Sequence, residues 1–161
     1  MTDERLGHGL VGNGRVLGLV HPSTAIEWLC MPRFDSPSVF GRLLDAKQGG
    51  VFRFLLDGQE IVGDSSYVTN TNVLRTVVSS TSGTFEVLDF APRYRAAREI
   101  RAPIELVRLL RPLEGSPRVT VDFDPRPDFS LAPVSLHDEG GAITVRGGTE
   151  PFHLATNVPV S

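Results

Sequence analysis

The stretch GRVLGLVHPSTAIEWLCM, residues 14–31, indicates the fold class of this chain. Two apolar runs, 14–21 and 25–31, are joined by Pro-Ser-Thr at 22–24. Runs of this length, rich in branched aliphatic residues and separated by turn formers, are typical of two antiparallel strands in a hairpin. We therefore expect β-structure in this part of the chain.

The same strand pattern recurs further along the chain. In GGVFRFLL (49–56), Phe52 and Phe54 fall on one face, as expected for a half-buried strand. The run RVTVDFDP (118–125) alternates apolar and polar residues in the same way. Ser82-Gly83 separates two further runs and predicts another hairpin.

Glycine and proline interrupt these runs throughout. Sixteen glycines and twelve prolines separate strand-like segments, which recur every ~8–12 residues, the spacing typical of a sandwich or barrel. We predict an all-β fold: an antiparallel β-sandwich, supersandwich-like, with residues 1–161 forming a single domain.

Evidence for a helix is limited to SPSVFGRLLDAKQGG, residues 36–50. Ser36 is suited to an N-cap, Pro37 to the first helical position, and Gly49 to the residue after the last turn. These signals predict one short helix near residues 37–47.

Two segments are ambiguous. IELVRLLRPL (104–113) has apolar spacing that fits either a helix or a strand; we favour a strand because Pro103 and Pro112 bound it closely. The basic segment RYRAAREIRA (93–102) fits either a helical turn or a loop.

Composition narrows the class of protein. The chain has 161 residues, with 40% apolar and 22% charged residues and a net charge of −3. These values suit a globular domain and give no reason to expect nucleic-acid binding. No apolar stretch approaches the ~20 residues of a membrane helix, and MTDERLGHGL (1–10) lacks the pattern of a signal peptide. A single cysteine, Cys30, excludes an internal disulfide. We expect a cytoplasmic protein with no nucleic-acid or membrane partner.

Motifs for cofactors and catalysis are weak. GHGLVG (7–12) matches G-x-G-x-x-G, but no strand precedes it and a strand-like run follows, so we attribute the match to turn glycines. No pair among His8, His21, His137 and His153 has metal-ligand spacing. We expect no cofactor and no metal.

The sequence also selects no catalytic residue. It contains no nucleophile elbow, and sequence spacing alone does not select a pair of carboxylates for sugar hydrolysis, so we assign no catalytic residue.

Three ordered blocks carry a family resemblance. Residues 12–40, GNGRVLGLVHPSTAIEWLCMPRFDSPSVF, resemble the N-terminal domain of bacterial trehalases and glucoamylases of glycoside hydrolase family fifteen. YVTNTNVLRTVVSSTSGTFEVLDFAP (67–92) and LVRLLRPLEGSPRVTVDFDPRPDFSLAP (106–133) look like two later blocks of that domain. Two departures are modest: Ser23-Thr24 stand where the family has Asp-Gly, and Pro127 replaces a phenylalanine.

The resemblance implies a domain without catalytic residues. In that family the β-sandwich precedes a barrel of paired helices, and the barrel holds the two catalytic glutamates that hydrolyse α-glucosidic bonds. Such a barrel needs several hundred more residues, so we expect this chain to be inactive alone and the sandwich to be whole or shortened at its C-terminal end. The implied function is to pack on the barrel, in cis or in trans, and to help shape its active site.

The segment WLCMPRFDSPSVF (28–40) holds the candidate site residues Trp28, Arg33, Phe34 and Asp35. Two prolines should stiffen the loop around residues 33–35. Arg33 and Asp35 could bond sugar hydroxyls, or they could pair with each other while Phe34 packs inward and Asp35 or Ser36 caps the helix. Trp28 suits a core or an interface.

Two other functions stay open: a stand-alone carbohydrate-binding module and a sandwich that mediates oligomer contacts. One tryptophan and two tyrosines are poor material for a sugar-binding platform. The family resemblance implies a helical-barrel catalytic domain as the partner. An α-glucoside sugar and a second copy of the chain, in a homodimer, are the further partners that these functions would involve.

Overall fold

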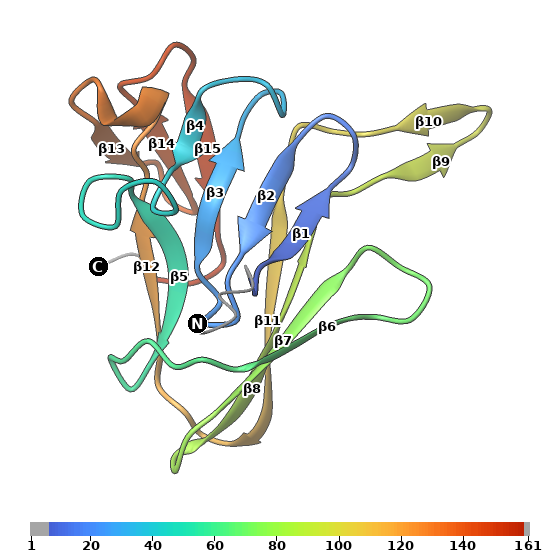
Figure 1. The fold of residues 1–161 in the computed structure, drawn as a ribbon, viewed down its shortest axis with the longest axis vertical. Helices are drawn as coiled ribbons and strands as arrows, with labels where there is room; N and C mark the ends of the chain where they lie inside the picture. Colours follow the sequence, from blue (N-terminus) through green and yellow to red (C-terminus); the bar gives the residue numbers. More distant parts are fainter. Residues whose placement is uncertain (1–6, 160–161) are drawn as a thin grey trace, which may run out of the picture.

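The computed structural model describes residues 7–159 and is built almost wholly from antiparallel strands (Figure 1). The first sheet, sheet A, has the strand order β1 (Gly9–Gly12), β2 (Leu17–Val20), β3 (Ile26–Cys30), β5 (Val51–Leu56), β12 (Val119–Asp124), with β4 (Ser38–Phe40) paired to β3. The predicted all-β antiparallel sandwich is confirmed.

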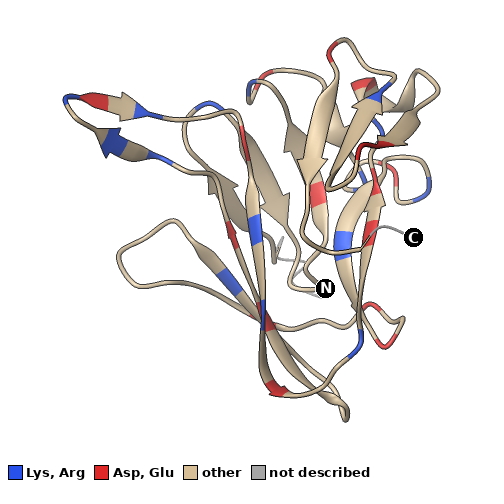
Figure 2. Cartoon of the chain, turned by 180° about the vertical axis from the view of Figure 1, so that it is seen from behind, with Lys and Arg blue, Asp and Glu red and all other residues tan. Residues whose placement is uncertain are grey.

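Three other groups of strands accompany sheet A. Sheet B has the order β11 (Val107–Gly115), β8 (Gly83–Phe90), β7 (Leu74–Ser79), β6 (Asp64–Tyr67). A smaller sheet has the order β13 (Ser135–Asp138), β14 (Ala142–Arg146), β15 (Phe152–Ala155). The strands β9 (Tyr94–Ala96) and β10 (Glu99–Arg101) form a hairpin that projects from the body and carries charges of both signs (Figures 1 and 2).

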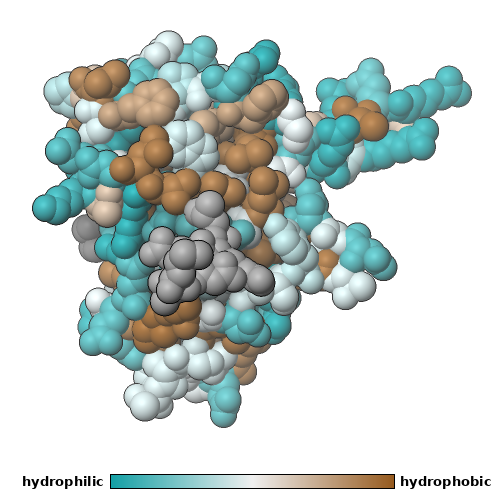
Figure 3. Space-filling model, viewed as in Figure 1, coloured by the Kyte–Doolittle hydropathy of each residue, from teal (hydrophilic) through white to brown (hydrophobic). Residues whose placement is uncertain are grey.

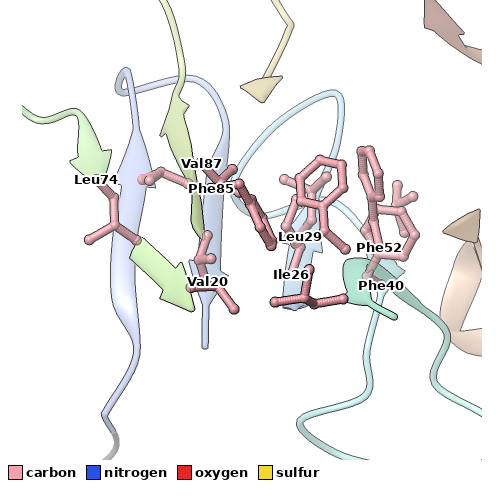
Figure 4. Packing of buried hydrophobic residues seen from close by; sticks show 13 residues of the cluster. Val20, Ile26, Leu29, Phe40, Phe52, Leu74, Phe85 and Val87 are labelled. Carbon is pink, nitrogen blue, oxygen red and sulfur yellow. The ribbon is translucent and has the colours of Figure 1, made fainter. Parts of the chain in front are cut away.

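The core lies between sheets A and B. Its buried members include the following residues (Figure 4): Val20, Ile26, Leu29, Phe40, Phe52, Leu74, Phe85 and Val87. Burying a side chain of this size contributes about 1.5–3 kcal/mol each. Phe52 and Phe54 are both buried, so the predicted inward face of 49–56 is confirmed.

The local strand predictions are confirmed. Residues 14–31 contain the β2–β3 hairpin, and β7 and β8 form a second hairpin whose turn includes Ser82 and leads into β8 at Gly83. The ambiguous run 104–113 contains the start of β11, as favoured. Segment 93–102 forms the β9–β10 hairpin, which neither of the two interpretations anticipated.

The predicted helix near residues 37–47 is wrong. Ser38–Phe40 form β4 instead, and all three residues are buried against β3. The residues after β4 form turns, in which the Asp45 carboxylate accepts hydrogen bonds from the backbone N–H groups of Lys47, at 2.8 Å, and Gln48, at 3.0 Å. A short surface helix is only marginally stable, whereas strand geometry buries Val39 and Phe40 together.

The G-x-G-x-x-G match also has a structural explanation. Gly9–Gly12 form β1, an edge strand that pairs with β2, so the glycines lie in a strand and not in a turn. A Cβ at Gly9 would lie 2.4 Å from Leu74 Cδ2, so glycine permits the close approach of β1 to sheet B.

Among residues 7–159, no helix is long and apolar enough to cross a membrane. The prediction that the N-terminus lacks a signal peptide rests largely on residues 1–6, which lie outside the described residues.

Candidate functional site

An apolar row crosses the outer face of sheet A. Leu10 of β1 stands opposite Leu19 of β2, and Leu19 stands opposite Trp28 of β3. Their neighbours Val11, Val20 and Leu29 point into the core. Because side chains alternate along strands, the row faces away from sheet B.

The row continues onto a second segment of the chain. The rings of Trp28 and Phe129 lie 6.3 Å apart, and Phe129 is 52% exposed. Phe129 has φ = 58°, in the left-handed region, as do both of its neighbours, Asp128 and Ser130. Asp128 secures this turn by accepting hydrogen bonds from Thr149 N, at 2.7 Å, and Thr149 Oγ1, at 2.8 Å.

Leu10, Leu19, Trp28 and Phe129 together form what we call the apolar row. Leu10 is 48% exposed, and Leu19 and Trp28 are half-buried. Figure 3 shows this side of the molecule, where apolar residues gather across the middle between hydrophilic margins. A face of this kind suits contact with another protein surface, because its burial there removes apolar area from water.

The loop that follows β3 carries the predicted site residues. Arg33 Nε donates to Asp35 Oδ1 at 2.8 Å and Arg33 Nη2 donates to Asp35 Oδ2 at 3.1 Å, so the two side chains form a bidentate pair. Both side chains are more than half exposed. The hydrogen bond from Arg33 holds the pKa of the Asp35 carboxyl below its ordinary value. The loop therefore presents a matched pair of opposite charges to solvent.

Backbone contacts order this loop. Phe34 N donates to Arg15 O at 2.7 Å, and Arg33 N donates to Ser36 Oγ at 3.2 Å. The Ser36 hydroxyl thus closes the loop, and it caps no helix. The expectation that Phe34 packs inward is wrong, because its side chain is 55% exposed and the loop is held through its main chain.

Cys30 ends β3 next to this loop and is 3% exposed. Burial raises the pKa of its thiol, so the neutral form is favoured. Cys30 thus acts as a small buried apolar residue of the core.

A charged network covers the other half of the outer face. Arg53 of β5 stands opposite Asp122 of β12, with Arg53 Nε 2.8 Å from Asp122 Oδ2. Arg53 also binds Glu60, which Arg42 contacts at 3.1 Å. Glu27 links the network to β3.

Glu60 is the centre of this network. Burial raises the pKa of its carboxyl, but the hydrogen bond from Ser23 and the charges of Arg42 and Arg53 outweigh burial, so the pKa falls below its ordinary value. The Ser23 hydroxyl lies 2.6 Å from Glu60 Oε1. The network is therefore built to keep Glu60 ionised.

The fold brings together three possible metal ligands that sequence spacing did not reveal. Ligand atoms of His21, Glu27 and Glu60 all lie within 4.8 Å of one another. Arg42 contacts both carboxylates, so a guanidinium already supplies the positive charge that a cation would add. The chemistry of this group therefore suits a structural ion-pair network better than a metal centre.

Sequence reasoning found Trp28 and the 33–35 loop but missed Leu10, Leu19 and Phe129. The alternation of Leu17 and Leu19 with inward-facing residues was the available signal for the outer face. The contact of Phe129 with Trp28 joins residues about a hundred positions apart, and no local pattern indicates it.

The fold places the chain among β-sandwich domains, and comparison with known proteins defines the family. The family described as "Trehalase-like, N-terminal" matches residues 3–158, so the chain belongs to this family. No solved structure gives a significant match.

The curated relatives are much longer than this chain. A trehalase of Thermoplasma volcanium is 32% identical over 139 residues, covering 84% of this chain and 22% of the relative. Trehalase 1 of Sulfolobus acidocaldarius is 40% identical over 100 residues, covering 61% of this chain and 17% of the relative. The Mycobacterium tuberculosis trehalase is 26% identical over 163 residues, covering 88% of this chain and 24% of the relative. The chain thus spans about a quarter or less of these trehalases.

Proposed function

We propose that this chain is the non-catalytic N-terminal domain of a hydrolase of α-glucosidic bonds, of the trehalase or glucoamylase type. It packs on a helical-barrel catalytic region and helps to shape the active site. The single observation that carries the proposal is the apolar row on the outer face of sheet A. Family membership and the greater length of the named trehalases support it.

The 33–35 loop supplies the second part of the proposal. Arg33 and Asp35 are exposed and already paired, so their free hydrogen-bonding capacity is directed to solvent. Arg and Asp side chains of this kind bind sugar hydroxyls or the polar rim of an interface. In the assembled enzyme the loop borders the substrate site, next to the face covered by the barrel.

A cytoplasmic location of the protein is also part of the proposal.

Trp28 allows a direct test because it is the only tryptophan. The chain is produced with 5-fluorotryptophan, which gives one ¹⁹F resonance from the apolar row. The probe is the part of the Thermoplasma volcanium trehalase that follows its matched region, produced separately. Association through the row shifts this resonance, because the half-buried ring becomes covered. An unchanged resonance in a complex that forms would contradict docking through this face.

Two matched variants test the same face by the affinity of the chain for the separately produced remainder of the trehalase. Leu10→Glu lies in the row, and Leu136→Glu lies on β13; the two leucines are 48% and 49% exposed. Placing a charge in an apolar contact costs at least about tenfold in affinity, or about 1.4 kcal/mol. We expect that loss for Leu10→Glu and little change for Leu136→Glu. Equal effects of the two variants would overturn the assignment of the row.

Activity assays test the non-catalytic part. The purified 161-residue chain is incubated alone with trehalose and with a maltooligosaccharide, and released glucose is measured. We expect no turnover above a blank, because hydrolysis needs a pair of carboxyl groups placed across the glycosidic bond. Turnover that a point mutation within this chain abolishes would contradict the proposal.

A further inference from the structure

One cavity lies on the opposite side of sheet A from the apolar row. Its volume is about 670 Å³, and its floor includes the apolar side chains Ile26, Leu29, Phe40, Phe52 and Phe123. These residues come from β3, β4, β5 and β12 of sheet A. The cavity is therefore an opening into the core of the sandwich.

One edge strand, and the segment that leads into a second edge strand, border this cavity. One wall is formed by Ile104–Leu106, directly before β11, and the other includes Phe152–Leu154 of β15. β11 ends sheet B, and β15 ends the smaller sheet. Both strands lie behind sheet A in Figure 1 and in front of it in Figure 2. Among the described residues, neither outer edge pairs with another strand.

Unpaired strand edges beside an apolar floor indicate an extended polypeptide as the occupant of the cavity. Another extended chain can hydrogen-bond a whole row of free backbone N–H and C=O groups. A small ligand cannot form hydrogen bonds along the full length of such an edge. An added strand also points every second side chain toward the floor. Ser38 Oγ, on the floor, is buried without a hydrogen-bond partner in the described chain.

The rim of the cavity is acidic. Glu105 and Glu150 line it, and neither forms an ion pair with a described residue. A basic side chain on the incoming strand would meet these carboxylates, which favours a polypeptide with an Arg or Lys beside its apolar positions.

We propose that the cavity receives one extended strand of the remaining polypeptide of a trehalase-length protein, which pairs with the free edge of β11 or β15. The strand places alternate apolar side chains on the floor and a basic residue near Glu105 and Glu150. This inference rests on the proposed function, and it adds a second contact on the side of sheet A opposite the apolar row. The greater length of the trehalase relatives, of which this chain spans about a quarter or less, supplies the polypeptide.

Hydrogen–deuterium exchange tests the location. The 161-residue chain is measured alone and with the separately produced remainder of the Thermoplasma volcanium trehalase. We expect slower exchange in 104–107 and 152–155 in the complex, because paired edge amides are protected. Association with protection confined to the outer face of sheet A would overturn this inference and leave the proposed function standing. Absence of any association would overturn both.

A matched pair of variants tests the cavity itself. Ile104→Arg places a charge at the cavity wall, and Leu109→Arg places one on β11 away from it; the side chains are 43% and 45% exposed. Neither change removes a buried side chain. We expect Ile104→Arg to weaken association about tenfold or more, and Leu109→Arg to change it less than about twofold. Equal affinities of the two variants would overturn the inference.

The same exchange experiment separates other occupants. Concentration-dependent protection of 104–107 and 152–155 in the chain alone identifies a second copy as the occupant and overturns the proposal. Protection of these residues by trehalose alone, at concentrations that leave the rest of the chain unchanged, identifies a sugar site and also overturns it.

Discussion

Arg108 and Asp89 form a buried ion pair within sheet B, and the same Arg108 side chain also reaches sheet A. They stand opposite each other on β11 and β8, with Arg108 Nε 2.7 Å from Asp89 Oδ1, and their side chains are 3% and 0% exposed. The guanidinium also donates to the carbonyl oxygens of Phe52 and Thr24, which belong to sheet A and its β2–β3 turn. The rings of Phe52 and Phe54 each lie 4.7 Å from Arg108 Cζ. One arginine therefore satisfies polar groups of both layers inside an apolar core.

Removing Arg108 should strongly destabilise the chain. Arg108→Met leaves the Asp89 carboxylate buried without its partner, and breaking such a pair costs about 3–5 kcal/mol. Denaturant unfolding measures the change. The control is Arg101→Ala, at an exposed pair with Glu99, where we expect no more than about 0.5 kcal/mol. Similar small losses for both variants would contradict the bridging role of Arg108.

Thr24 offers a test of backbone strain against hydrogen bonding. It has φ = 70°, in the left-handed region that favours glycine, and it is fully buried. Its Oγ1 accepts from Phe54 N at 3.0 Å and donates to Phe54 O at 3.3 Å. Thr24→Gly relieves about 1–2 kcal/mol of strain but leaves two backbone groups unpaired.

We therefore expect the stability order Thr, then Gly, then Ala at position 24. Thr24→Ala keeps the strain and loses both hydrogen bonds, so its loss should be about 2–3 kcal/mol, against about 1 kcal/mol for Thr24→Gly. Urea unfolding of the three proteins gives the order. A glycine variant more stable than the natural chain would show that strain outweighs the hydrogen bonds.

Glu60 predicts a pH dependence of stability. Its pKa in the folded chain lies below the ordinary value of 4.5, so its ionised form stabilises the fold above that value. This stabilisation is lost as the pH falls below 4.5 through the folded pKa. We expect Glu60→Gln to lower stability at neutral pH and to reduce the decline between about pH 5 and pH 3. Melting curves across that range provide the measurement, with exposed Glu114→Gln as the control; identical pH profiles for Glu60→Gln and the natural chain would refute the assignment.

Arg33 should matter little for the stability of the isolated chain. Its guanidinium is exposed, and its partner Asp35 remains solvated after substitution. Arg33→Ala should therefore leave the melting temperature unchanged within error. In a complex with the catalytic part of a relative, the same variant should lower association or turnover. A large drop in the melting temperature of the isolated chain would show that Arg33 has a structural role instead.

The β2–β3 hairpin and the helix predicted near 37–47 show where local patterns suffice. The hairpin is specified by alternation and turn residues within 14–31, all of them neighbours in sequence. Whether 37–47 forms a helix or a strand depends on whether Val39 and Phe40 can pair with β3 and become buried. The residues that surround 37–47 in the sequence do not contain that information. Cap signals at Ser36 and Pro37 were real but weaker than that burial.

The sequence likewise predicted one part of the candidate site and not another. Two prolines and the residue types of 31–37 indicated an ordered loop, and the loop is closed by Ser36 and joined to Arg15. That Phe34 faces solvent was not predicted, because the direction of a loop side chain depends on which main-chain groups hold the loop.

The sequence by itself determined the strand-rich class, the family and the segments that become hairpins, because period-two alternation and turn residues act over a few neighbouring positions. The tertiary structure alone decided three things: the apolar row through Leu10, Leu19 and Trp28, the Arg108–Asp89 ion pair, and the cavity between residues 104–106 and β15. Each depends on register or packing between strands far apart in the chain, where a shift of one residue would turn every side chain to the opposite face.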